Sequence, residues 1–254
     1  MKRLLVIGIG AGDPEHVTVQ AIRALNEVDV FFVIEKGQET EELVRLRLEI
    51  CERYIKDSSY RIVPVPDPPR ERTAPAYSSA VEDWRERRAD VWERLINEEL
   101  RTERCGAFLV WGDPSLYDST LAVIDRILAR GTVDFEHEVV PGISSVHALT
   151  ARHRTPLNRV AGAVQITTGR RLAQGFPEGV DDVVVMLDAD CSFQQIDTEG
   201  IEIHWGAYLG TKDEILVSGP LEEVGGEIMR VRREARERKG WIMDSYLLRR
   251  TNPR

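Results

Sequence analysis

The chain has 254 residues, of which 42% are hydrophobic, and this length suits one large domain or two modest ones with a proper core. Its 34 lysines and arginines against 43 aspartates and glutamates give a net charge of −9, which argues against a nucleic-acid partner. No run of about 18 uncharged apolar residues and no signal peptide is seen, so we expect a cytoplasmic protein without a membrane partner.

The N-terminal half alternates between apolar runs and stretches with helical spacing. Apolar runs predict strands at 3–10, 29–34, 60–66, 106–111 and 135–140. Apolar residues at helical spacing predict helices over 17–28, 41–55, 81–100, 116–130 and 144–151. This alternation indicates an open, mostly parallel α/β sheet.

The C-terminal half has a different build. Strands are predicted at 163–169, 182–187, 201–209, 214–219 and 241–248. With one long charged helix over 221–239, this half is expected to be α+β with much antiparallel pairing. We therefore expect an N-terminal α/β domain at 1–155 and a C-terminal α+β domain at 156–254. Two domains of different build suggest a ligand in the trough between them.

Three of the predicted strands end in loops that combine glycine with short polar residues: "GIGAGDPEHVT", "GDPSLYDST" and "PGISSV". Ligands of open α/β sheets bind outside the carboxyl ends of the strands, so we expect these loops to converge on one site. Asp113, in the second loop, has two interpretations. It could cap the next helix, with Pro114 in the first turn, or it could form one wall of the pocket.

The first loop does not fit a dinucleotide site. The fingerprint Gly-x-Gly-x-x-Gly is broken, because Gly8 and Gly10 are followed by Asp13 at the position of the third glycine. Glu35 stands roughly where a ribose-binding acid would, but a carboxylate at a strand end is common. We therefore expect neither NAD nor FAD.

The three cysteines are widely spaced and do not match a disulfide framework or a zinc site; they are Cys51, Cys105 and Cys191. We interpret them as small core residues and expect no metal.

Residues 139–177 contain no aspartate or glutamate, although the chain as a whole is acidic. The same span carries five arginines: Arg152, Arg154, Arg159, Arg170 and Arg171. Such a cationic stretch favours a polyanionic ligand. The alternative is that these arginines pair with acids from elsewhere in the fold.

The three loops, in this order, resemble those of the tetrapyrrole methylases. The resemblance covers nearly the whole chain, and "PGISSVHALTARHRTPLNR", "VVVMLDAD" and "WGAYLGTKDEIL" resemble the deacetylating members in particular. It implies the two-domain class III methyltransferase fold and a homodimer. One departure is Ala11, where the family usually has proline.

The resemblance also implies S-adenosylmethionine as the co-substrate. The positions that match the family's cofactor contacts are Gly112, Asp113, Leu116, Ser144, Ser145, Met186, Leu187, Ala207 and Gly210. The implied reaction is methylation of precorrin-5 at ring carbon 1 with loss of acetate. Because this tetrapyrrole bears many carboxylates, the five arginines, and Arg70 and Arg72 in an earlier loop, are expected to face it.

Methyl transfer from a sulfonium requires positioning and the exclusion of water, not a protein nucleophile. Acetate release calls for water and a proton acceptor, for which Asp13 and His153 are our candidates, with Glu35 and His147 as further ones. The arginines beside His153 would lower its pKa. Two alternatives stay open, namely a methyltransferase for another precorrin or corrin, and a non-catalytic tetrapyrrole-binding protein.

Overall fold

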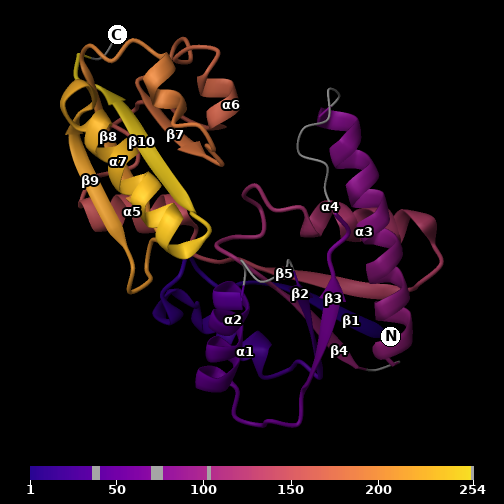
Figure 1. Cartoon of the computed structure of the whole chain (residues 1–254). Coiled ribbons are helices and arrows are strands. Elements are labelled where there is room, and N and C mark those ends of the chain that lie inside the picture. The colour runs from indigo at the N-terminus through magenta and orange to yellow at the C-terminus, as the bar shows by residue number, and fades with distance from the viewer. Residues whose placement is uncertain (36–40, 70–76, 102–103, 253–254) are drawn as a thin grey trace. The chain divides into compact units, whose positions relative to one another are not determined.

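The structure, a computed structural model, describes residues 1–35, 41–69, 77–101 and 104–252. Its contacts divide the chain into two units (Figure 1). Unit 1 comprises Met1–Gly10 and Pro14–Ile143, and unit 2 comprises Ala11–Asp13 and Ser144–Arg254. The division after Ile143 precedes the 155/156 boundary expected from the sequence.

Unit 1 contains a five-stranded sheet in the order β3-β2-β4-β1-β5, in which every pairing is parallel. The strands are β1 (Lys2–Gly8), β2 (Val30–Glu35), β3 (Arg61–Pro66), β4 (Cys105–Val110) and β5 (Phe135–Val140). The predicted parallel α/β sheet is confirmed. Because β1 lies between β4 and β5, the carboxyl ends of these three strands are neighbours.

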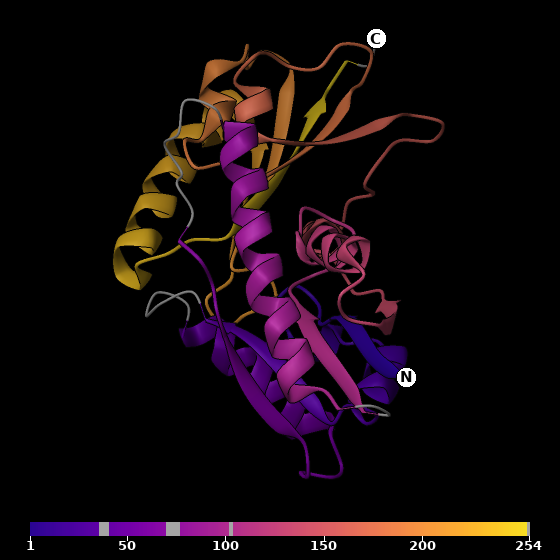
Figure 2. The ribbon, with the colours of Figure 1, turned by 90° about the vertical axis from the view of Figure 1, so that its right-hand side faces the viewer.

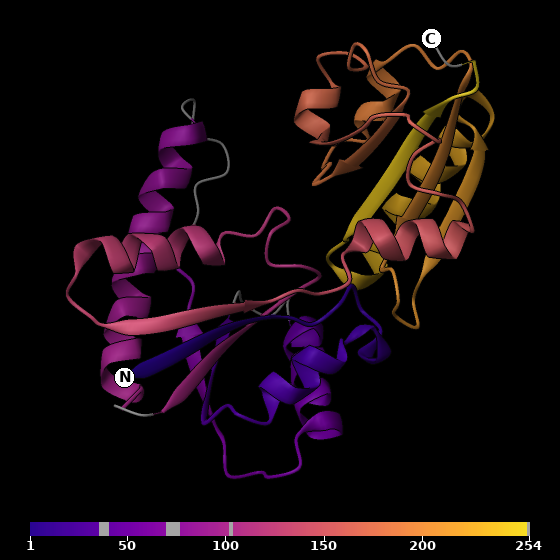
Figure 3. The same ribbon diagram turned by 180° about the vertical axis from the view of Figure 1, so that it is seen from behind.

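Helices cover both faces of this sheet (Figure 3). They are α1 (Val19–Leu25), α2 (Glu41–Tyr54), α3 (Tyr77–Glu99) and α4 (Thr120–Arg130), with a short 3-10 turn η1 (Pro14–His16). Successive side chains of a strand point to opposite faces, so Leu4 and Val6 pack with α3 and α4, whereas Leu5 and Ile7 pack with α1 and α2. Burial on both faces explains why β1 is an unbroken apolar run.

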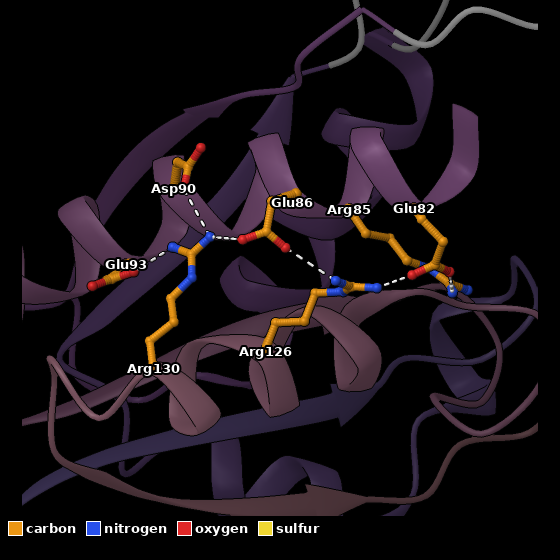
Figure 4. A network of polar contacts seen from close by, with 7 residues as sticks. All are labelled: Glu82, Arg85, Glu86, Asp90, Glu93, Arg126 and Arg130. Carbon is orange, nitrogen blue, oxygen red and sulfur yellow. Dashed lines mark hydrogen bonds and ion pairs between the residues drawn. The ribbon is translucent and has the colours of Figure 1, made fainter. Parts of the chain in front are cut away.

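Ion pairs join α3 to α4 on the surface (Figure 4). Arg130 Nη2 lies 2.8 Å from Asp90 Oδ1, and Arg130 Nη1 lies 2.5 Å from Glu93 Oε2. Arg126 and Arg130 both contact Glu86. These carboxylates raise the pKa of Arg130, and the largest cause is the hydrogen bond that Arg130 donates to Glu86. Exposed pairs contribute little singly, but here one arginine holds several carboxylates of α3 in place.

Unit 2 contains a mixed five-stranded sheet in the order β6-β7-β10-β8-β9. The strands are β6 (Val164–Thr168), β7 (Asp182–Met186), β8 (Ile201–Ala207), β9 (Ile215–Pro220) and β10 (Asp244–Arg250). Only the β6–β7 pairing is parallel, and the other three are antiparallel. The expected α+β build is therefore confirmed.

The helices of unit 2 are α5 (Ser145–His153), α6 (Gly169–Leu172) and α7 (Leu221–Lys239), with a 3-10 turn η3 (Ser192–Gln195). The sequence did not predict α6 or η3. Helix α7 runs along one face of the sheet (Figure 2), where Ile228 and Ala235 are buried with Trp205. Helix α5 packs on the other face, where His153 contacts the main-chain carbonyl oxygen of Trp205, so α5 belongs to unit 2 and the division falls before it.

All three cysteines are free and buried, as expected. Among the described residues, no helix is long and apolar enough to cross a membrane. Within the same residues, no three histidine, cysteine, aspartate or glutamate side chains are grouped so as to hold a metal ion.

Candidate functional site

The parts of the three glycine loops that belong to unit 1 meet at the carboxyl ends of β4, β1 and β5, as the sequence predicted. The main chains of Gly10 and Gly112 exchange hydrogen bonds, at 2.8 Å from Gly112 N to Gly10 O and 3.3 Å in the other direction. A Cβ atom on Gly142 would collide with the carbonyl oxygen of Gly112. Glycine is therefore required there, since the main chains touch directly.

Asp113 links the loops after β4 and β5. Its Oδ2 accepts a hydrogen bond from Gly142 N at 2.9 Å, and its Oδ1 accepts from Ser115 N at 2.9 Å and from the Ser115 hydroxyl. The interpretation of Asp113 as the cap of the next helix is wrong, because α4 begins only at Thr120, whose N–H donates to Asp118 Oδ1 at 2.7 Å. The carboxylate instead fixes the geometry of both loops.

The residues after Asp113 form a turn before α4. Leu116 N donates to Asp113 O at 3.2 Å, and the Leu116 side chain is half-buried. Tyr117 is 45% exposed and has a left-handed backbone, with φ at 51°. Left-handed residues other than glycine are uncommon and concentrate at functional sites.

Arg47 of α2 is a residue near this edge that the sequence did not single out. Its Nε donates to the carbonyl oxygen of Leu109, the residue before the last of β4, at 3.2 Å. Burial lowers the pKa of Arg47, and the nearby Asp118 opposes that effect. In the sequence, Arg47 is one of several arginines in a charged helix, and no spacing distinguishes it.

The segment Ala11–Asp13 belongs to unit 2, where Gly12 packs directly against the carbonyl oxygen of Leu209. This places Asp13, one of the two candidate bases, in unit 2. The other, His153, is also in this unit. The role of either residue in catalysis stays a prediction.

Two of the expected cofactor contacts lie at the end of β8: Ala207 is the last residue of the strand, and Gly210 lies in the turn that follows. Gly210 N donates to Glu214 Oε2 at 2.8 Å. Tyr208 is buried in a left-handed conformation, with φ at 51°, and its hydroxyl donates to Trp241 O at 2.6 Å. The turn is thus held through its main chain and through the Tyr208 side chain.

The end of β7 presents Met186, which is half-buried, and Leu187, which is 66% exposed. At the start of α5, Ser144 is buried and its Oγ lies 2.9 Å from His147 Nδ1. Ser145 Oγ lies 3.4 Å from Ser245 Oγ of β10. Each of these residues is expected to contact the cofactor, and those roles stay predictions.

His153 is held against the sheet of unit 2. Its Nε2 donates to the carbonyl oxygen of Trp205 at 3.0 Å, and its ring centroid lies 5.3 Å from that of His204. Burial lowers the pKa of His153, whereas the sequence had pointed to the flanking arginines. The neutral form expected of a base is therefore favoured, but for a different reason.

Two of the five arginines expected to bind substrate pair within unit 2. Arg152 Nε lies 2.5 Å from Glu214 Oε1, and Arg159 donates to the carbonyl oxygen of Arg250. Arg154 directly follows α5, and Arg170 and Arg171 are exposed on α6. The alternative of pairing with acids from elsewhere in the fold therefore holds for Arg152, and Arg159 Nη1 lies 4.0 Å from Asp181 Oδ2.

Three residues considered from the sequence cannot be placed. Arg70 and Arg72 lie outside the described residues, and so does the side chain of Glu35.

The chain is similar in sequence to a known protein family. The family model for Tetrapyrrole (Corrin/Porphyrin) Methylases matches residues 3–225. Precorrin-6A synthase (deacetylating) of Sinorhizobium sp is 50% identical to this chain over 249 residues, which cover 98% of this chain and 95% of that protein.

Two solved structures are also similar. A cobalamin synthesis related protein from Corynebacterium diphtheriae matches with a TM-score of 0.86 and 35% identity, covering 99% of this chain and 100% of that one. Uroporphyrin-III C-methyl transferase from Thermus thermophilus, complexed with S-adenyl homocysteine, matches with a TM-score of 0.59 and 18% identity, covering 97% and 91%. The second likeness shows a shared fold.

Proposed function

The chain belongs to the tetrapyrrole (corrin/porphyrin) methylase family, and from this premise we propose that it methylates precorrin-5 at ring carbon 1 and releases acetate. The methyl donor is S-adenosylmethionine. The observation that carries the proposal is the likeness over nearly the full length to a precorrin-6A synthase (deacetylating). The three converging glycine loops support it, because they bring main-chain groups to the carboxyl edge of a parallel sheet, where such folds bind ligands.

The residues of unit 1 suit the methionine part of the co-substrate. Asp113 is a carboxylate beside the Gly112 main chain, and a charge-assisted hydrogen bond to an ammonium group would orient the ligand. The half-buried side chain of Leu116 supplies an apolar surface against which the ligand could pack. S-adenosylmethionine supplies an activated methyl group, so the protein needs only to position the reactants and exclude water.

The residues of unit 2 suit the adenosine part. Met186 ends β7 and Leu187 follows it, whereas Ala207 ends β8 and Gly210 lies in the turn that follows. Ser144 and Ser145 add hydroxyl groups at the start of α5. The trough between the domains that the sequence suggested for the cofactor stays a prediction.

Release of acetate requires water to attack the acyl carbon and a group that accepts the proton of that water. The bond between the acyl carbon and the macrocycle then breaks, and its electron pair stays on the ring system. We propose Asp13 and His153 for this second role. His153 is kept neutral by burial, and because its Nε2–H donates to a carbonyl oxygen, its Nδ1 carries the lone pair that could accept a proton. No metal is expected to take part.

The test is a single-turnover reaction of the purified protein with precorrin-5 and S-adenosylmethionine, with mass spectrometry of the products. One acetate and one S-adenosylhomocysteine per methylated ring support the proposal. Methylation of a different macrocycle would identify a related methyltransferase, and tetrapyrrole binding without turnover would identify a non-catalytic binding protein. A methylated product that keeps its acetyl group would contradict the deacetylating reaction.

We also propose that the protein works as a homodimer in the cytoplasm, without nucleic-acid or membrane partners. The family resemblance supports the dimer, and the net charge of −9 argues against a nucleic acid. Light scattering on the eluting protein tests the oligomeric state, and a monomer at all concentrations would contradict it.

A further inference from the structure

Leu187 has an unusual combination of conformation and exposure. It follows β7 directly, the residue is 66% exposed, and its φ is 53°. A left-handed backbone is unfavourable for leucine and persists only where the surroundings impose it. Some part of unit 2 must therefore hold this residue in place.

The next residue, Asp188, has a side chain that can do so. It is 6% exposed, and its Oδ2 accepts hydrogen bonds from Ser192 N at 2.7 Å and from the Tyr246 hydroxyl at 2.5 Å. Its Oδ1 accepts from Ser192 Oγ at 2.9 Å and from Asp190 N at 3.1 Å. The carboxylate is therefore satisfied by the turn that it closes and by strand β10.

Two further contacts surround Asp188, one with its main chain and one with its side chain. Arg232 of α7 donates to the carbonyl oxygen of Asp188 at 2.7 Å. On the other side, a Cβ atom on Gly169 would overlap Asp188 Oδ1, so the junction of β6 and α6 packs directly against the carboxylate. Asp188 is thus enclosed by segments from three other parts of unit 2.

Tyr246 reinforces this arrangement. It lies on β10, where it pairs in register with Val185 of β7. Burial is the largest cause of a raised pKa of Tyr246, and the neighbouring Asp188 adds to it. The hydroxyl therefore stays protonated and keeps donating to the carboxylate.

We propose that Asp188 is a positioning residue, which holds Leu187 in its left-handed conformation so that Leu187 contacts the adenosine part of S-adenosylmethionine. The inference rests on the proposed function, because Leu187 is one of the expected cofactor contacts. In this proposal the buried Asp188 side chain does not touch the ligand, and it acts only through the conformation of Leu187.

The test compares Asp188→Asn with Asp190→Asn by calorimetry with S-adenosylhomocysteine. Asparagine has nearly the shape of aspartate, but its NH2 group cannot accept the hydrogen bonds that one carboxylate oxygen accepts. We expect Asp188→Asn to raise the Kd about 10-fold to 100-fold, as for the loss of a buried charged hydrogen bond. Asp190→Asn, which changes an exposed carboxylate of the same turn, should leave the Kd unchanged.

A second pair of measurements separates positioning from folding. Tyr246→Phe removes one of the four hydrogen bonds and should raise the Kd less than Asp188→Asn does. In turnover, both variants should raise KM for S-adenosylmethionine, with KM for the tetrapyrrole unchanged. If Asp188→Asn does not fold, the Kd of Tyr246→Phe for S-adenosylhomocysteine decides whether the inference holds.

Three outcomes are distinguishable. An unchanged Kd in folded Asp188→Asn or Tyr246→Phe protein, even with a lower Tm, overturns the inference and leaves the proposed function intact. Equal weakening by Asp190→Asn also overturns it. Failure of the unaltered protein to bind S-adenosylhomocysteine counts against the proposed function instead.

Discussion

Arg152 and Gly210 are joined through one carboxylate. Arg152 Nε donates to Glu214 Oε1 at 2.5 Å, and Gly210 N donates to Glu214 Oε2 at 2.8 Å. The Glu214 side chain is 9% exposed, whereas that of Arg152 is 56% exposed. The Glu214 carboxylate therefore connects α5, through Arg152, to the main chain of the turn after β8. Arg152 thus helps to hold that turn in place.

Replacement of Glu214 tests this relationship. Glu214→Ala leaves the Gly210 amide without its acceptor, and we expect S-adenosylhomocysteine binding to weaken by about 1–3 kcal/mol. Arg152→Gln should cost less than about 1 kcal/mol, because the arginine is half-exposed and its pair is screened by water. Calorimetry measures both. A larger loss in Arg152→Gln than in Glu214→Ala would contradict the arrangement, and Glu199→Ala, an exposed acid of unit 2, is the control.

Asp113→Asn should disturb the loops of unit 1. Asparagine can keep one acceptor oxygen, but it loses either the bond from Gly142 N or those from Ser115. We expect S-adenosylhomocysteine affinity to fall by about 1.5–3 kcal/mol, the range for a hydrogen bond to a charged group. Isothermal titration checks this value. Asp125→Asn, on the exposed face of α4, is the matched control, and equal binding by both variants would remove Asp113 from the site.

At least two of the five arginines of the cationic span should bind substrate carboxylates; the five are Arg152, Arg154, Arg159, Arg170 and Arg171. Arg152 donates to Glu214, and Arg159 donates to the carbonyl oxygen of Arg250, so these two side chains are also held within unit 2. Replacing a contacting arginine with glutamine should raise KM for the tetrapyrrole by an amount equivalent to about 1–3 kcal/mol, with cofactor affinity unchanged. Steady-state kinetics on the single variants measures this change. If every variant keeps the KM of the unaltered protein, the cationic span is a structural feature only.

Stability should fall in mild acid because of the two neighbouring histidines of unit 2. Burial lowers the pKa of His153 and of His204 below the usual 6.5, and the neighbouring His153 lowers the pKa of His204 further. The unfolded chain therefore takes up protons before the folded protein does. The contribution to stability is present above about pH 6.5 and is lost as the pH falls toward the lower folded pKa values.

Thermal unfolding between pH 7.5 and pH 5 measures this effect. The variant His153→Gln should show a smaller loss of Tm on acidification than the unaltered protein. His137→Gln, which changes an exposed histidine of β5, should keep the original slope. An unaltered protein whose Tm rises on acidification in this range would contradict the assignment.

Much of the fold follows from local patterns in the sequence. The helix predicted over 221–239 is found as Leu221–Lys239, because acids in its first turn and Gly240 after its last turn mark both ends. The convergence of the glycine loops was predictable as well, since parallel strands share one carboxyl edge.

Other features depend on contacts between distant residues. The start of α4 was predicted too early because Asp113 bonds to Gly142, which lies 29 residues away in the chain. The pairing of Arg152 with Glu214 spans 62 residues. Neither Leu187 nor Tyr208 signals a left-handed backbone by its residue type, and only the packed unit imposes it.

The assignment of Ala11–Asp13 to unit 2 has a consequence for dissection of the protein. The chain leaves unit 1 after Gly10, returns at Pro14 and leaves again after Ile143, so unit 2 is discontinuous in sequence. A single proteolytic cut after Ile143 cannot release it whole. A fragment of residues 144–254 would lack Gly12, which packs on Leu209. A fragment that contains all of unit 2 would need the tripeptide Ala11–Asp13 joined to it by a new peptide linkage.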